Sequence, residues 1–87
     1  MGFEPAPAAQ SLDRAQTGAE GRVVGVQAPA AQPDWGRWLA EIGFLPGERV
    51  SVRARSLGGD PLVVRIGTST FGLRRAEAAC VQVQALP

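Results

Sequence analysis

The sequence predicts a mainly β domain, a small barrel of about five short strands with one helix capping an open end. Polar and apolar residues alternate along several short segments, and a single longer segment has the 3.6-residue period of an amphipathic helix. The segments follow one another too closely for the helical crossovers that parallel strands require. So few short strands cannot fill two sheets, but they can curl into a barrel that removes most exposed edges.

The composition fits one globular domain and argues against several classes of protein. The 87 residues carry nine basic and eight acidic side chains, and this net charge of +1 argues against a nucleic-acid binder or a polybasic membrane anchor. Histidine and lysine are absent, so the usual general bases are missing and we expect no enzymatic activity. The single cysteine permits no internal disulfide, and neither a signal peptide nor a membrane span is visible, so the expected location is the cytoplasm.

The folded domain is expected to span 11–87, because residues 1–10 (MGFEPAPAAQ) are rich in Pro and Ala without periodicity and resemble a flexible tail. A short N-terminal helical turn is expected next. Ser11 can cap its free N–H groups, Leu12 supplies an anchor for the core, and Gly18 can end it.

Residues 20–28 (EGRVVGVQA) have the β-branched composition of a first strand. Because side chains alternate between the two faces of a strand, Val24 and Val26 are expected on one face and Val23 on the other. A loop that contains two prolines follows this strand and separates it from the helix.

The helix is predicted from an apolar stripe at positions i, i+3, i+4 and i+7. The stripe consists of Trp35, Trp38, Leu39 and Ile42. Asp34 is expected to be the N-cap and Gly43 to end the helix. Trp38 is expected to fill the end of the barrel, whereas Trp35, at the helix start, is expected to be half covered and is a candidate contact for a partner protein.

A type II turn at Pro46–Gly47 leads into the strand 48–55 (ERVSVRAR), which alternates strictly. The inward positions are Val50, Val52 and Ala54, and the outward positions include Arg49, Ser51, Arg53 and Arg55. The three arginines, together with Arg65, are expected to form a positive face that suits an acidic surface of a partner protein. The alternative interpretation is a solvated strand face without a partner.

The C-terminal part is predicted as a hairpin, one helical turn and a final strand. Segments 62–66 and 70–74 form the hairpin, residues 75–79 the helical turn, and residues 80–85 the last strand. Cys80 falls on the outward phase of that strand, but a buried small side chain is the preferred interpretation.

Three stretches of the sequence combine these elements in a characteristic order. The first is SLDRAQTGAEGRVVGV, a short turn and a glycine followed by a strand rich in valine. The second is WLAEIGFLPGERVSV, in which a helix ends at a glycine and a Pro-Gly turn leads into a strand. The third is PLVVRIGTSTFGLRRAEAACVQV, a hairpin that leads into a final strand. Through these stretches the chain resembles, over 11–86, the FeoA family of small cytoplasmic proteins of bacterial ferrous iron uptake.

This resemblance implies an SH3-like barrel that acts as an accessory protein of FeoB, the membrane permease of the system, which carries a cytoplasmic G-protein domain. The chain would bind the cytoplasmic face of the permease and modulate its activity through protein–protein contacts. The helix departs from the family pattern, because two tryptophans and Gly36 stand where members more often carry Leu, Arg and Glu. The sequence does not determine the oligomeric state, and a homodimer is compatible with it.

Two other functions are weighed against this one. A metal sensor or chaperone for iron or zinc would need ligands, but the candidates Cys80, Asp34, Glu41, Glu48, Asp60 and Glu77 show no ligand spacing, so no metal and no cofactor is expected. A nucleic-acid-binding barrel has only the arginine-bearing strand in its favour, and the balanced charge argues against it.

Overall fold

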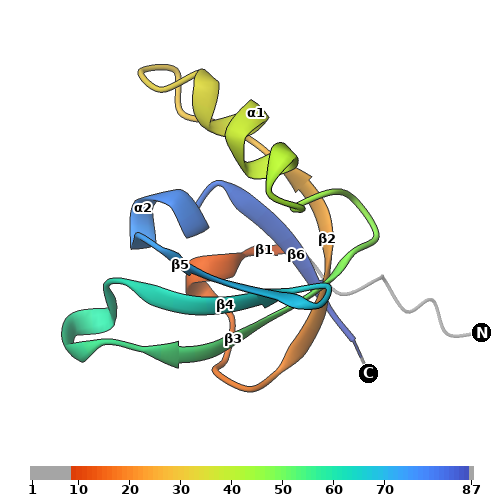
Figure 1. Ribbon diagram of the computed structural model, residues 1–87, viewed down its shortest axis with the longest axis vertical. Helices are drawn as coiled ribbons and strands as arrows, with labels where there is room; N and C mark the ends of the chain where they lie inside the picture. The colour runs from red at the N-terminus through yellow and green to blue at the C-terminus, as the bar shows by residue number, and fades with distance from the viewer. Residues whose placement is uncertain (1–8, 87) are drawn as a thin grey trace, which may run out of the picture.

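The computed structural model describes residues 9–86 and confirms the mainly β prediction. Six antiparallel strands form one curled sheet in the order β1-β6-β2-β3-β4-β5. The strands are β1 (Gln10–Ser11), β2 (Glu20–Val26), β3 (Arg49–Arg55), β4 (Leu62–Ile66), β5 (Ser69–Leu73) and β6 (Val81–Ala85). The helical segments are η1 (Leu12–Arg14), α1 (Asp34–Glu41), η2 (Leu57–Gly59) and α2 (Arg75–Ala78). Figure 1 shows α1 projecting from the curled sheet, while α2 lies close against it.

The sheet has one strand more than the sequence predicts. Residues 1–8 of the predicted tail lie outside the described residues, but Gln10 pairs with Val83 and Ser11 with Gln82 to form β1. A strand of two residues has no alternation that could reveal it. In η1, which follows, Ser11 makes no side-chain capping hydrogen bond, and the helix ends at Arg14, well before the predicted Gly18.

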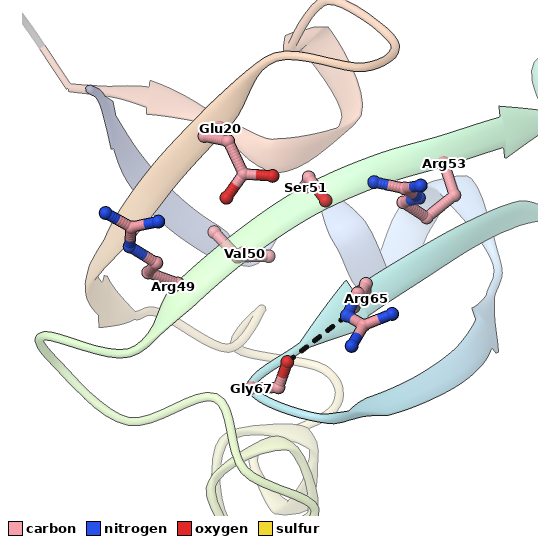
Figure 2. Close-up of a pocket in the computed structure, with 7 residues that line it drawn as sticks. All are labelled: Glu20, Arg49, Val50, Ser51, Arg53, Arg65 and Gly67. Atoms are coloured by element: carbon pink, nitrogen blue, oxygen red, sulfur yellow. Dashed lines mark hydrogen bonds between the residues drawn. The ribbon is translucent and has the colours of Figure 1, made fainter. Parts of the chain in front are cut away.

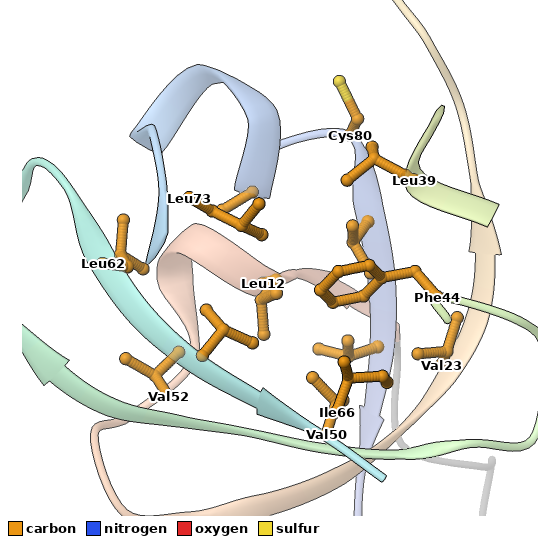
Figure 3. Close-up of a cluster of buried hydrophobic side chains, with 14 residues drawn as sticks. Leu12, Val23, Leu39, Phe44, Val50, Val52, Leu62, Ile66, Leu73 and Cys80 are labelled. Atoms are coloured by element: carbon orange, nitrogen blue, oxygen red, sulfur yellow. The ribbon is translucent and has the colours of Figure 1, made fainter. Parts of the chain in front are cut away.

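The core fills the inside of the curled sheet (Figure 3). Its largest fully buried side chains are Phe44, Leu12, Leu39, Leu62, Leu73, Val52, Val64 and Val81. Leu12 and Phe44 come from outside the sheet, and Leu12 is the core anchor that the sequence predicts. Because side chains fill the interior, binding is left to the outer surface.

A β-bulge in β2 overturns the predicted faces of the first strand. The register against β6 shifts between Val23 and Gly25, so one extra residue interrupts the alternation. Val23 is buried in the core and Val26 packs against it, whereas Val24 is 49% exposed. The prediction that Val24 and Val26 share a face is therefore wrong.

A second bulge, in β3, changes the outward row of arginines. The register against β4 shifts between Val52 and Ala54, and the strand changes phase at this point. Ala54, predicted to point inward, is exposed, while Arg55 is partly buried. Val50 and Val52, before the bulge, are buried as predicted.

The helix α1 lies where the sequence predicts it, but the prediction that Trp38 fills the end of the barrel is wrong. Leu39 is buried, Trp35 and Ile42 pack against the core, and Trp38 is 39% exposed. At 100° per residue, Trp35 and Ile42 lie within about 60° of Leu39 on the helix surface, whereas Trp38 lies about 100° away. A narrow contact face centred on Leu39 thus leaves Trp38 outside it. The predicted N-cap is also wrong by one residue, because Asp34 is the first helical residue and Pro33 precedes it.

The connection from α1 to β3 depends on two glycines with positive φ. Gly43 has φ +123° directly after the helix, and Gly47 has φ +91°. The N–H of Glu48 donates to the carbonyl of Leu45 at 3.1 Å, which closes the turn around Pro46 and Gly47. The positive φ at its third position makes this the type II turn that the sequence predicts.

Replacing Gly43 with alanine is expected to lower the free energy of unfolding by about 1–3 kcal/mol, because residues with a side chain rarely adopt a φ in this range. Steric crowding adds little, since the new Cβ would meet Ile66 at 3.8 Å, an ordinary contact. Urea denaturation measures the change. Gly36→Ala is the matched control within α1, where alanine is expected to stabilise the helix by about 0.5–1 kcal/mol. Equal destabilisation by both substitutions would contradict this account.

Candidate partner-binding site

A shallow groove of about 250 Å³ lies on the outer face of the sheet, across β2, β3 and β4. Its lining residues are Glu20, Arg49, Val50, Ser51, Arg53, Arg65 and Gly67, and we call it the arginine groove. Figure 2 shows that its polar side chains rise from three neighbouring strands on one side of the sheet. It contains two of the four residues predicted to bind a partner, Arg49 and Arg53, and also Arg65.

Strand pairing brings the residues of the arginine groove together. Glu20 on β2 lies opposite Ser51 on β3, and Ser51 lies opposite Arg65 on β4. Side chains opposite one another in neighbouring strands share a face, so these three form a row across the sheet. Arg49 and Arg53 lie two residues before and after Ser51 on the same strand. Glu20 was not predictable from the sequence, because its place beside the arginines depends on the register between β2 and β3.

The cationic groups of this groove are largely unpaired. The Nε of Arg65 donates to the carbonyl of Gly67 at 3.4 Å, a long hydrogen bond. Within residues 9–86, the guanidinium groups of Arg49 and Arg53 make no hydrogen bond or ion pair. Three arginines stand against one carboxylate, that of Glu20, so the groove has a local charge of 3 − 1 = +2. A surface with this charge attracts carboxylates and repels cations.

Arg55 does not belong to this groove, and its predicted position on the arginine face is wrong. The bulge in β3 turns its side chain toward the N-terminal segment, where it makes three hydrogen bonds. Its guanidinium donates to the carbonyl of Asp13 at 2.9 Å, to the carbonyl of Ala15, and to Oγ1 of Thr17 at 3.2 Å. Arg55 thus ties the segment around η1 to the sheet.

The fourth predicted contact, Trp35, is partly buried and packs against the core. The half-covered position that the sequence predicts is correct, but the ring contributes to the attachment of α1. Trp38 is the tryptophan with the larger exposed surface, and it lines another groove, which contains Arg74 but none of Arg49, Arg53 and Arg65.

Cys80 lies between α2 and β6 and is buried, as the sequence analysis prefers. Its Sγ donates to the carbonyl of Ala76 at 3.5 Å. Burial raises the pKa of the Cys80 thiol above 9.0, and the carboxylates of Glu77 and Asp13 raise it further. Among residues 9–86, no three His, Cys, Asp or Glu side chains come close enough together to hold a metal ion.

The Cys80 thiol is expected to react with iodoacetamide much more slowly than the same thiol in the urea-unfolded chain at pH 8, because the reactive form is the thiolate.

Deprotonation of the Cys80 thiol should also reduce the stability of the fold at high pH. The folded state holds this proton more tightly, so the stabilisation is complete below the unfolded pKa of about 9.0 and declines as the pH rises through the folded value. Equal alkylation rates in the folded and unfolded chain would contradict the burial of this thiol.

None of the helices in the described part of the chain is long and apolar enough to cross a membrane. No curated protein sequence matches the chain. Several solved structures do. FeoA of Stenotrophomonas maltophilia, determined as a zinc complex and described as an SH3 domain protein, is 36% identical, with a TM-score of 0.80 over 87% of this chain and 91% of that one.

Two further structures are similar over most of this chain. Iron(II) transport protein A of Clostridium thermocellum is 27% identical, with a TM-score of 0.75 over 88% of this chain and 46% of that one. A manganese-dependent transcriptional repressor is 29% identical, with a TM-score of 0.78 over 94% of this chain. This chain spans 44% of the repressor and so corresponds to part of that larger protein.

The sequence itself matches the model of the FeoA domain over residues 10–85, which is nearly the whole described structure. Together with the curled sheet, its capping helix and the SH3 domain of Stenotrophomonas maltophilia, this match confirms the predicted SH3-like barrel. The chain belongs to the FeoA family, which is linked to ferrous iron transport.

Proposed function

We propose that this chain is a cytoplasmic accessory protein of bacterial ferrous iron uptake that binds the cytoplasmic face of a FeoB-type permease and modulates its activity. Membership of the FeoA family supports a role in ferrous iron uptake. The arginine groove supports the mode of action, because unpaired cations on a rigid sheet suit docking to an acidic surface. The FeoA of Stenotrophomonas maltophilia, described as a candidate activating factor of ferrous iron transport, supports the same role.

The single observation that carries the docking proposal is that the guanidinium groups of Arg49 and Arg53 have no partner within residues 9–86. Arginines that serve the fold bond to carbonyls, as Arg55 does. The unpaired guanidinium groups can instead form bidentate hydrogen bonds with carboxylates of another protein. Modulation then requires that the docked surface differ between two states of the permease, because a partner shifts an equilibrium only by its difference in affinity.

Co-purification of the full chain with the cytoplasmic domain of the permease tests this proposal, with the domain held empty, bound to GDP or bound to a non-hydrolysable GTP analogue. We expect retention in at least one state and different affinities among the three. Retention that does not change with the nucleotide would support docking and overturn modulation. Absence of retention in every state would overturn the proposal as a whole.

A further inference from the structure

We propose that the free edge of β5, beside Trp38, binds an extended segment of a partner protein as an additional strand of the sheet. This inference goes beyond the proposed function and does not depend on the arginine groove. It rests on the register of the last hairpin, on the groove that runs along it, and on the charges within that groove.

The register shows which backbone groups of β5 point away from the sheet. In the described chain β5 is the last strand of the sheet, with only β4 beside it. Gly67 and Thr68 form a two-residue turn closed by the pair Ile66–Ser69, and Gly67 has φ +58° while Thr68 has a negative φ, as in a type II′ turn. The two residues that close such a turn exchange backbone hydrogen bonds. Moving away from the turn, opposing pairs that exchange hydrogen bonds alternate with pairs that do not.

Applied along β5, this alternation directs the N–H and C=O groups of Phe71 and Leu73 toward β4. Those of Thr70 and Gly72 point outward, and within residues 9–86 they have no partner. Both residues are exposed. Two outward donors and two outward acceptors, spaced for a strand, are the groups that strand addition uses.

A groove of about 660 Å³ borders this edge and supplies a second wall. Its lining residues are Trp38, Asp60, Pro61, Gly72, Arg74 and Glu77. Trp38, which is 39% exposed, comes from α1, and Gly72 comes from β5. In Figure 1 β4 runs along one side of β5, and within residues 9–86 no strand pairs with its other side. A Cβ built at Gly72 would have nothing within 4 Å, so alanine fits at this position without a clash.

Hydrogen bonds hold the far end of this groove in place. The N–H of Arg74 donates to Oε1 of Glu77 at 2.8 Å, and the N–H of Arg75 donates to Oδ1 of Asp60 at 3.0 Å. These bonds fix the passage from β5 into α2, so a binding segment would meet a preformed surface and lose less free energy to ordering the groove.

The charges and the walls select the occupant. One arginine, Arg74, faces two carboxylates, those of Asp60 and Glu77, so the groove disfavours an acidic segment. The ring of Trp38 favours an apolar side chain on the segment that binds. One extended segment is enough to pair with the outward groups of Thr70 and Gly72, whereas pairing with a second copy would show as a dimer. The occupant is therefore a single extended segment that is not acidic and carries an apolar residue facing Trp38.

Random peptides of about six to eight residues, long enough for one strand, are the probe, displayed on phage and selected on the full chain. Selected peptides are expected to be poor in Asp and Glu. The selected peptides should bind the Gly72→Ala variant as tightly as they bind the wild type. Gly72→Pro should weaken binding about tenfold or more, because it removes the outward N–H without removing a hydrogen bond to β4. Trp38→Ala should weaken binding as well. Hydrogen exchange at Thr70 and Gly72 should slow when the peptide binds.

Edge strands tolerate proline, so Gly72→Pro is expected to fold, and circular dichroism checks this. If it does not fold, a semisynthetic chain with N-methylglycine at position 72 removes the same N–H without fixing φ. Peptides that bind both Gly72 variants as tightly as the wild type, or a selection that yields no peptide, would overturn the proposal. A dimer of the wild type that Gly72→Pro dissociates would also overturn it, because the edge would then belong to a second copy.

Discussion

The double substitution Arg49→Glu with Arg53→Glu is expected to abolish retention by the cytoplasmic domain of the permease, with a loss of affinity of about a hundredfold or more. Each change removes a guanidinium that has no partner within residues 9–86 and places a carboxylate where the acidic surface would dock. The loss therefore combines missing attraction with like-charge repulsion. Titration calorimetry at low and at physiological salt measures it, and the wild-type affinity should fall as the salt concentration rises.

A control variant with the same net charge tests whether the loss of affinity comes from the arginine groove or from the change in total charge. Arg14→Glu with Arg37→Glu changes two exposed arginines on η1 and α1, and it takes the net charge from +1 to 1 − 4 = −3, as the groove variant does. This control is expected to weaken binding only a few-fold, through reduced steering. Equal losses in both variants would show that total charge matters and the arginine groove does not. Both variants should unfold at urea concentrations close to that of the wild type, because none of the four guanidinium groups makes a hydrogen bond in the described chain.

Local patterns were sufficient to predict much of this fold. The alternation of Leu62, Val64 and Ile66 with the exposed Val63 and Arg65 holds along β4, whose inward side chains are all buried. The Pro-Gly turn before β3 depends only on the conformations those two residues favour, so it was also predictable. In both cases the physical cause lies within a few neighbouring residues, and the sequence displays it.

The remaining features depend on pairing between distant segments. Each bulge shifts the register against a neighbouring strand, β6 for the bulge at Val24 and β4 for the bulge at Arg53. Gly25, beside the first bulge, is a residue type that often marks one, but nothing within β3 marks the second. Strict alternation therefore placed Arg55 on the wrong face. The burial of Trp38 was wrongly predicted for a related reason. A 3.6-residue period shows that Trp35 and Trp38 share a stripe, but only the docking angle of α1 decides which edge of the stripe is covered.

The same bulge makes Arg55 the arginine whose loss should cost the most stability. Arg55→Ala is expected to lower the free energy of unfolding by about 2–3 kcal/mol, because hydrogen bonds from a charged group stabilise strongly and their loss leaves acceptors unsatisfied. Two of these acceptors are the main-chain carbonyls of Asp13 and Ala15, which flank the end of η1. Urea denaturation followed by circular dichroism measures the change.

Arg53→Ala is the natural control, since it removes a guanidinium from the same strand that makes no hydrogen bond within residues 9–86. It should change stability by less than about 0.5 kcal/mol, as is usual for exposed positions.

Arg55→Lys tests whether the charge alone stabilises the fold or whether the geometry of the guanidinium is needed. A lysine ammonium keeps the charge but cannot reach three acceptors with a planar fork, so it should recover less than half of the loss. If Arg53→Ala and Arg55→Ala were equally mild, or if lysine restored full stability, the tie between β3 and the N-terminal segment would not depend on this side chain. The expected pattern, a large loss at Arg55 beside a negligible one at Arg53, would show that one bulge divides the arginines of β3 between the fold and the surface.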